Sequence, residues 1–365
     1  MKISPKVIWN LKRILPFGLI WLVIACLLMW TEYAVVTDQT KTPESAIPIT
    51  PAIVLFATVS IFLVGCLVGM LEVFYVNSLF KNLSFPRKIL GKFLLYTVLL
   101  SILVLILYML AASLVSKSPV FSKSVWDQYV VFFFSITHIS TGVQLLFSLL
   151  TSLLYAEISE NIGQNVLLNF FTGKYHKPVV EDRIFMFVDM KDSTPIAESL
   201  GHEKYFDLLR SYYFHFSDAI IHNHGQVYQY VGDEIVITWK LKNGLARNHC
   251  LQCFYDMKSA LAKKEKFYAD NFGVTPDFKA ALHIGEVTTG EIGALKKDIF
   301  FTGDVLNTTA RILGLCGEYQ EDLLLSKELS EQLDLGGDFT VRTLANASLK
   351  GKKEKVEIVS VRPSA

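Results

Sequence analysis

The chain has 365 residues, of which 52% are hydrophobic and only 19% are charged, and its formal net charge is +1. So few charges are unusual for a water-soluble protein, and the 26 Phe and 15 Tyr exclude an intrinsically disordered chain. The near-zero net charge gives no support to nucleic-acid binding, so we expect no nucleic-acid partner. The five cysteines are too few and too scattered for a secreted disulfide framework.

The two halves of the chain differ in composition. Residues 1–156 carry 11 Lys and Arg against 5 Asp and Glu and are otherwise predominantly apolar. Residues 157–365 carry 24 Lys and Arg against 29 Asp and Glu and have the composition of a soluble domain. We therefore predict a membrane domain at 1–156, a helical connector at 157–181 and a water-facing domain at 182–365.

Four stretches in the first half lack charged residues. A helix needs roughly 20 residues to cross a bilayer, so the stretches predict an all-α, four-helix transmembrane bundle. Lys12 and Arg13 precede the first stretch, as in a signal peptide, but no small-residue cleavage site follows, so we expect a retained span. The stretches are Ile14–Trp30, Pro51–Leu71, Phe93–Ser116 and Tyr129–Ala156.

The distribution of Lys and Arg around these stretches predicts their orientation. Four such residues lie in the N-terminal flank and four in the loop after the second stretch. The loop after the first stretch holds one, and the loop after the third holds two. By the positive-inside rule, both termini of this multi-pass protein lie in the cytoplasm and the bundle lies in the cell (inner or plasma) membrane. No motif in the bundle indicates what stimulus it receives.

His138 is an ionisable residue inside the fourth stretch. Such a residue is a candidate ligand for a haem, a metal or a proton. It lies beside Thr137, Ser140, Thr141 and Gln144, and no second histidine is evident among the stretches. We therefore favour a neutral histidine that is hydrogen-bonded to these neighbours.

The connector shows helical periodicity between residues 157 and 177. Ile158, Ile162, Val166 and Phe170 recur every four residues. This pattern predicts an amphipathic helix. The helix either caps the domain that follows or dimerises and couples the membrane to that domain, and the spacing does not separate the two interpretations.

The second half alternates strand and helix patterns around a central hairpin. A strand at 184–188 ends at Asp189, a helix is expected from about 193 to 223, and strands at 226–231 and 234–239 flank a Gly232-Asp233 turn. A helix at 246–268, a strand at 278–284 and a helix at 305–314 follow, which predicts an α/β or α+β sandwich. If the first strand lies beside the hairpin, Asp189 and Asp233 converge. Paired carboxylates of this kind bind Mg²⁺ together with substrate phosphates; the alternative is that Asp189 only caps the following helix.

Four segments of this half carry a resemblance to a known family. They are FVDMKDST (187–194), YQYVGDEIVITW (228–239), LHIGEVTTGEIG (282–293) and FTGDVLNTTARI (301–312). Together they resemble the class III adenylate/guanylate cyclase catalytic domain, in a bacterial membrane-anchored type with an N-terminal multi-span region. The resemblance covers about residues 182–361. It implies a ferredoxin-like βααββαβ core that works as a homodimer and converts ATP to cyclic AMP and pyrophosphate.

The resemblance assigns catalytic and metal-binding roles. Asp189 and Asp233 match the aspartates that hold two Mg²⁺ or Mn²⁺ ions per site, and Met190 matches a residue whose backbone carbonyl also reaches a metal. Asn307 matches the residue that orients the ribose, and Arg311 matches the one that stabilises the transition state. Their spacing of four places both on one helical face. In the family one subunit supplies the aspartates and the other the Asn/Arg pair, so a homodimer of this chain would hold two complete sites and a monomer none.

Four further positions concern the nucleotide itself. Lys350 and Lys279 match basic positions near the phosphates, although Lys350 stands in a run of lysines that could simply be solvated. Gln229 and Phe300 occupy the positions that read the purine, and they match neither the adenine pair nor the guanine pair of the family. Gln229 can hydrogen-bond either base, and Phe300 can only pack or stack. We favour ATP because no guanine-selecting acid is present, with GTP as the alternative.

Three other interpretations are weighed against this one. Gly232-Asp233-Glu234 is similar to the diguanylate cyclase signature, but the residues on either side depart from it. Cys250 and Cys253, with His249, are a lone pair of the CxxC type and indicate core packing rather than a metal site. A non-catalytic membrane receptor would not need the aspartates and the Asn/Arg pair. A transporter or channel would need charges inside its spans, and the stretches hold none besides His138.

Overall fold

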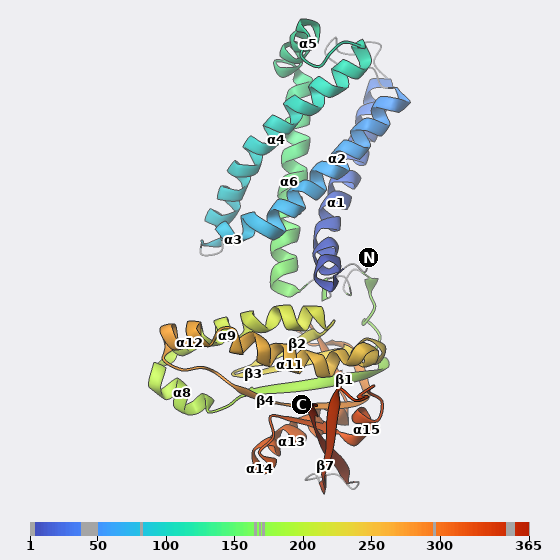
Figure 1. Ribbon diagram of the computed structural model, residues 1–365. Coiled ribbons are helices and arrows are strands. Elements are labelled where there is room, and N and C mark those ends of the chain that lie inside the picture. The colour runs from blue at the N-terminus through green and yellow to red at the C-terminus, as the bar shows by residue number, and fades with distance from the viewer. Residues whose placement is uncertain are drawn as a thin grey trace. The chain divides into compact units, whose positions relative to one another are not determined.

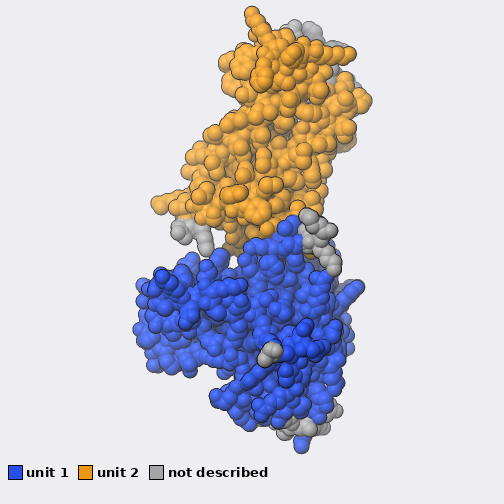
Figure 2. Space-filling view, viewed as in Figure 1, with its two compact units in different colours: residues 1–7, 169–365 blue, residues 8–168 orange. Residues whose placement is uncertain are grey.

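The computed structural model describes residues 4–37, 50–80, 83–163, 166–167, 169, 172–294, 297–347 and 355–364. It divides into two compact units (Figure 2), one of residues 8–168 and one of residues 1–7 with 169–365. The division at 168/169 falls inside the segment that the sequence predicts as a connector. We call the first the helical unit and the second the C-terminal unit.

Among its described residues, the helical unit contains four helices that are long and apolar enough to cross a membrane. The second of them continues beyond Leu71 as a π-helix, η1 (Glu72–Val76), and a short helix, α3 (Asn77–Leu79). The prediction of four long apolar helices is thereby confirmed. These helices are α1 (Pro5–Thr37), α2 (Pro51–Leu71), α4 (Phe85–Ser116) and α6 (Ile136–Ile162).

The fourth predicted stretch, 129–156, is not one helix. A separate helix, α5 (Lys123–Phe133), ends before Ser135, whose hydroxyl accepts a hydrogen bond from the backbone N–H of His138 at 3.3 Å and so caps α6. His138 therefore lies in the first turn of α6, with its ring against Phe132 and Phe133. Its Nδ1 is buried without a hydrogen-bond partner among the described residues, so the predicted bonding to neighbouring hydroxyls is not found at this atom.

The connector is also not one continuous helix. α6 extends to Ile162 and ends at Gly163, whose φ of 91° is a conformation that favours glycine. The predicted helix from 157 to 177 is therefore divided at this point. Val166 lies among the described residues beyond it, whereas Phe170 lies outside them.

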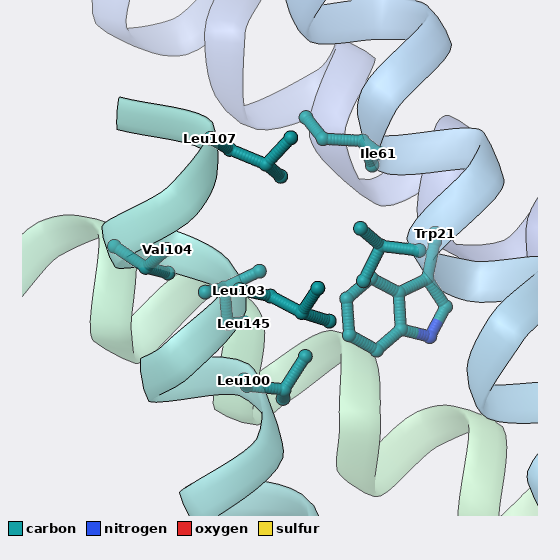
Figure 3. A pocket seen from close by; sticks show the side chains of 8 residues that line it. Trp21, Ile61, Leu100, Leu103, Val104, Leu107 and Leu145 are labelled. Atoms are coloured by element: carbon teal, nitrogen blue, oxygen red, sulfur yellow. The ribbon is translucent and has the colours of Figure 1, made fainter. Parts of the chain in front are cut away.

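Small residues let α1 and α2 approach closely. Gly65 and Gly69 are spaced as in a GxxxG motif. A Cβ added to Gly65 would lie 2.9 Å from Trp21, and a Cβ added to Gly69 would lie 2.8 Å from Phe17. Trp21 also lines a cavity of about 40 Å³ between α1, α2, α4 and α6 (Figure 3), whose other lining residues are Ile, Val and Leu. A cavity of this size and lining is a packing gap between helices rather than a ligand site.

Charged side chains are buried in the helical unit just beyond the uncharged stretches. Glu72, Lys92 and Glu157 are 3%, 0% and 7% exposed, and they lie where helices continue past those stretches. The helices are therefore longer than the predicted spans, and their added turns carry buried charges that the sequence analysis did not anticipate.

The C-terminal unit is built on a mixed sheet (Figure 1). In the described residues its strands lie in the order β2-β3-β1-β4-β6-β8-β7, and β5 pairs with β4. β1 lies between β3 and β4 and is antiparallel to both. The first four strands have the order and the βααββαβ connections of a ferredoxin-like core, as predicted. The strands are β1 (Val179–Met190), β2 (Gln226–Val231), β3 (Glu234–Lys240), β4 (Phe278–Ile292), β5 (Asp298–Thr302), β6 (Leu323–Ser326), β7 (Phe339–Ala347) and β8 (Val356–Pro363).

Helices cover both faces of this sheet (Figure 1), and each face has its own hydrophobic core. One core joins the sheet to α8, α9, α11 and α12, and the other joins it to α13 and α14. The helix predicted for 193–223 is divided at Gly201, whose φ is 73°, and the one predicted for 246–268 is also divided. The helices are α8 (Ser193–Leu200), α9 (His202–His222), α10 (Leu241–Leu245), η2 (Ala246–Asn248), α11 (His249–Ala262), α12 (Glu265–Phe272), α13 (Asp304–Gly314), α14 (Cys316–Tyr319) and α15 (Lys327–Ser330).

Candidate active site

Asp189 lies at the end of β1, next to both neighbouring strands. The register places it opposite Glu234 of β3 and Lys279 of β4. Residues two positions apart on a strand share a face, and Phe187 belongs to the core that α13 covers. Asp189 and Lys279 therefore lie on the α13 side of the sheet, where Lys279 Nζ is 3.2 Å from Asp189 Oδ2.

Asp233 lies in the tight turn between β2 and β3. Gly232 before it has a φ of 61°, which a residue with a Cβ rarely adopts. The hydroxyl of Tyr213 on α9 donates a hydrogen bond to the carbonyl oxygen of Gly232 at 2.8 Å, and its ring packs on Tyr230 at a centroid distance of 4.6 Å. The turn that carries Asp233 is thus held against α9 by a side chain that the sequence analysis did not single out.

The two aspartates meet, as the predicted convergence of β1 and the hairpin requires. Burial raises the pKa of Asp189, Lys279 partly offsets this rise, and the nearby carboxyl group of Asp233 adds to it. Burial also raises the pKa of Glu234, and the charges of Asp189 and Asp233 raise it further. Three carboxyl groups, those of Asp189, Asp233 and Glu234, therefore lie together at this edge of the sheet, and Lys279 is the basic residue beside them.

This arrangement fits a magnesium-type ion with few protein ligands. Two carboxylates and the backbone carbonyl of Met190 would hold the ion, and substrate phosphates would complete its shell. The Met190 side chain is buried in the core on the opposite face of the sheet, so only its backbone is available. Among the described residues, no group of three or more His, Cys, Asp and Glu side chains forms a complete metal site by itself.

Asn307 and Arg311 lie one turn apart on α13, as their spacing predicts. Asn307 is exposed and Arg311 is partly exposed. Within the described residues, neither side chain makes a hydrogen bond or an ion pair with its own chain, and neither contacts the aspartates. The described chain therefore brings the two aspartates together but does not bring the Asn/Arg pair to them.

The remaining predicted positions are distributed over the same sheet. Gln229 is exposed on β2 opposite Val236, on the α13 side, and Phe300 is 45% exposed on β5 opposite Gly290. No contact between Gln229 and Phe300 is found among the described residues. Lys350 lies outside the described residues, so its predicted role at the phosphates remains a prediction.

Cys250 and Cys253 are packing residues. Both are fully buried in the hydrophobic core under α11, and burial raises the pKa of the Cys250 thiol to about 12. Cys253 Sγ contacts Met257 Sδ at 3.8 Å. The interpretation of this pair as core packing agrees with these contacts.

A cluster of ion pairs that the sequence analysis missed connects the ends of neighbouring strands beside Asp189. Lys191 and Lys258 each bind both Asp277 and Asp322, which directly precede β4 and β6. Burial alone would raise the pKa of Asp277 and Asp322, but the hydrogen bonds from the two lysines outweigh it and lower both. The four residues lie up to 131 positions apart in sequence, so no local pattern reveals them.

The comparisons with known proteins identify this fold. Residues 177–361, slightly more than half of the chain, match the model of the adenylate and guanylate cyclase catalytic domain. The chain belongs to the class III adenylate/guanylate cyclase family. We call residues 177–361 the cyclase domain.

Relatives and solved structures agree with this assignment. The chain is 32% identical over 220 residues to adenylate cyclase 2 of Rhizobium meliloti (strain 1021), covering 60% of this chain and 61% of the relative. It is 28% identical over 186 residues to adenylate cyclase 1 of the same organism, covering 48% of this chain and 27% of that relative. A bacterial light-regulated adenylyl cyclase shares the fold of the cyclase domain, with a TM-score of 0.52 at 19% identity, over 60% of this chain and 64% of that one.

The Tyr213 hydroxyl gives a first testable prediction for this site. Tyr213→Phe removes the bond to Gly232 but keeps the ring on Tyr230, so the Asp233 turn loses one restraint worth about 1 kcal/mol. We expect the Mn²⁺ concentration for half-maximal cyclase activity to rise roughly fivefold with little change in Tm. Tyr255→Phe is the matched control, because it removes a hydroxyl bond to the carbonyl of Val361 instead. Equal metal dependence in both variants would contradict a positioning role for Tyr213.

Proposed function

We propose that this chain is a membrane-anchored adenylate cyclase that converts ATP to cyclic AMP and pyrophosphate. In this reaction the ribose 3′-oxygen bonds to the α-phosphorus, the bond from that phosphorus to the β-phosphate oxygen breaks, and the 3′-hydroxyl loses its proton. The proximity of Asp233 to Asp189, which lies on the sheet face that α13 covers, carries the proposal. The similarity to proteins named adenylate cyclase supports ATP as the substrate.

Metal binding and phosphate binding fall to different residues in this mechanism. Asp189, Asp233 and the Met190 carbonyl would hold two Mg²⁺ or Mn²⁺ ions, which supply a lowered pKa for the 3′-hydroxyl and charge neutralisation for the triphosphate. Lys279, beside Asp189, lies where it can bind phosphate oxygens, and we assign the same task to Lys350. These interactions hold the nucleotide so that its 3′-oxygen faces the α-phosphorus.

The residues of α13 act on the nucleotide from the second subunit of a homodimer. The Asn307 amide orients the ribose, and the Arg311 guanidinium stabilises the charge that develops on the α-phosphate. Both side chains lack partners within the described part of their own chain, which leaves them available to a site in a second protomer. A homodimer then holds two sites, and each takes its aspartates from one protomer and its Asn/Arg pair from the other.

The helical unit serves as the membrane anchor. Its four long helices expose many large apolar side chains, which a bilayer would cover. The excess of Lys and Arg in the flanks supports an orientation with both termini in the cytoplasm, where ATP is available. The charges that are buried in this unit are paired with one another and gather at the ends of the apolar stretches, so they do not support a transport path.

Product identification tests the proposal directly. Membranes that contain the full chain are given ATP or GTP with Mn²⁺, and the cyclic nucleotides are measured by mass spectrometry. We expect cyclic AMP from the wild type and none from Asp189→Asn, which keeps the shape of the side chain but removes its charge. Cyclic GMP as the main product would establish a guanylate cyclase instead. No cyclic product from either nucleotide would overturn the enzyme assignment.

The exposed ring of Phe300 gives a prediction about the purine. A phenyl ring can only stack or pack on a base, and such contacts contribute about 0.5–1.5 kcal/mol. We expect Phe300→Ala to raise the KM for ATP roughly fivefold, to raise that for GTP by a similar factor, and to leave kcat nearly unchanged. Initial rates over a range of each nucleotide measure the effect. An unchanged KM would remove Phe300 from the purine site.

A further inference from the structure

Six charged side chains lie together in the helical unit and are drawn from all four of its long helices. Three are basic and three are acidic, so the cluster has no net charge. Arg13 belongs to α1, and Glu72 belongs to the π-helix that extends α2. The others are Lys88 and Lys92 of α4 and Glu157 and Glu160 of α6. We call these six residues the charge network.

Lys92 is the centre of the network and is completely buried. Its Nζ binds the carboxylate of Glu72, lies 3.0 Å from Glu157 Oε1 and donates to Asn77 Oδ1 at 3.2 Å. The hydroxyl of Tyr96, one turn further along α4, donates to Glu72 Oε2 at 2.9 Å. These contacts join α2 and its extension to α4 and α6.

The outer part of the network secures the last turns of α6. Lys88 Nζ lies 2.7 Å from Glu157 and 3.9 Å from Glu160. Asn77 donates its side-chain N–H to Glu160 at 2.8 Å. Arg13 of α1 lies near enough for its charge to interact with those of Glu160 and Glu72, although no ion pair joins it to either among the described residues. α6 ends two residues after Glu160, at Ile162, and the chain that follows leads to β1 of the cyclase domain.

Stability alone does not account for such a network. Each buried ion costs several kcal/mol of desolvation, and well-packed apolar residues in place of a buried ion pair are often as stable or more stable. Buried polar groups are instead well suited to fixing one register between helices. The network also begins at a π-helix, a rare form that is frequently found at functional sites.

We propose that the charge network fixes the position of the last turns of α6 and thereby transmits the state of the helical unit to the cyclase domain. This inference rests on the proposed function, because the transmitted output is cyclase activity. A site that is shared by two protomers works only when its halves are aligned, and small misplacements cost large factors in rate. A fixed α6 end keeps the two halves aligned, and a loosened end reduces the rate without altering how one protomer binds nucleotide.

The test uses a variant that keeps the network neutral. Lys92→Met alone would leave buried carboxylates unpaired and destabilise the helical unit, so it is not decisive. The double variant Glu72→Gln with Lys92→Met removes one charge of each sign and leaves Arg13 and Lys88 opposite Glu157 and Glu160. Lys123→Met is the control, because Lys123 is an exposed lysine at the start of α5.

Two measurements are made on the full chain in lipid nanodiscs. For the double variant we expect kcat to fall about tenfold at an unchanged nucleotide KM. We also expect faster amide hydrogen exchange at residues 157–162 than in the wild type or in Lys123→Met. Unchanged kcat, with or without faster exchange, would overturn the transmission role, and unchanged exchange would overturn the positioning role. A wild type that is inactive with ATP and GTP would remove the proposed function and the transmission with it, while the exchange data would still decide whether the network holds α6.

Discussion

Co-expression of an Asp189→Ala chain with an Arg311→Ala chain should restore cyclase activity that neither variant has alone. Each mixed dimer carries one site in which both Asp189 and Arg311 are intact and a second site in which both are lost. If pairing is random, about half of the dimers are mixed, so the recovered activity should reach about a quarter of the wild-type value. The measurement is cyclic AMP formed per total chain in membranes from the co-expressing cells.

A second pair of variants provides the control for this experiment. Asp189→Ala with Asp233→Ala places both lesions in the same half of the site, so their mixed dimers contain no intact site and should stay inactive. Two different affinity tags show that mixed dimers form in each case. Absence of recovery from the Asp189→Ala and Arg311→Ala pair, despite confirmed mixed dimers, would rule out a site that is shared between protomers.

Replacement of Arg311 alone should have the largest effect of any single change on α13. Loss of a preorganised donor that stabilises developing charge costs about 3–4 kcal/mol of barrier, so we expect Arg311→Ala to lower kcat by two to three orders of magnitude with a small change in KM. Arg311 makes no ion pair within the described part of its own chain, so Tm should stay close to that of the wild type. Steady-state rates with saturating nucleotide and a thermal melt measure the two effects.

Two further variants define what Arg311 contributes. Arg311→Lys keeps the charge but loses the planar, forked donor, so we expect it to recover only part of the rate. Arg210→Ala removes an exposed arginine of α9 whose only ion pair in the described chain is with Asp207, and it should leave kcat unchanged. Equal rates for wild type and Arg311→Ala would exclude Arg311 from the reaction.

The sequence predicts much of this molecule because its signals there are local. Long uncharged stretches indicate the four long helices, and Gly232-Asp233 between two apolar runs indicates the hairpin. The errors in the helices also have local causes, since Ser135 caps α6 and Gly201 separates α8 from α9. Hydropathy averages over such single residues and so predicts one helix where the chain forms two.

Contacts between distant residues could not be predicted in this way. The approach of Asp189 and Asp233 follows from neighbouring strands and could be anticipated, but the pairing of Asp189 with Lys279 depends on the register of β1 and β4. The charge network is a stronger case, because Lys92 and Glu157 are 65 positions apart. From the sequence its residues look like charges that flank a span, and only the packing of the helices shows that they bind one another.

Asn307 and Arg311, which lack partners in the part of the chain that the structure describes, also bear on how a cell could set the output of this cyclase. If two copies must meet before either can react, the rate per copy rises with the number of copies in a given area of membrane. If the helical unit anchors the chain in a bilayer, as proposed, such encounters become far more frequent than they would be for the same number of copies in solution. Expression level and local clustering would then set the rate of cyclic nucleotide production per copy, without any additional regulatory site.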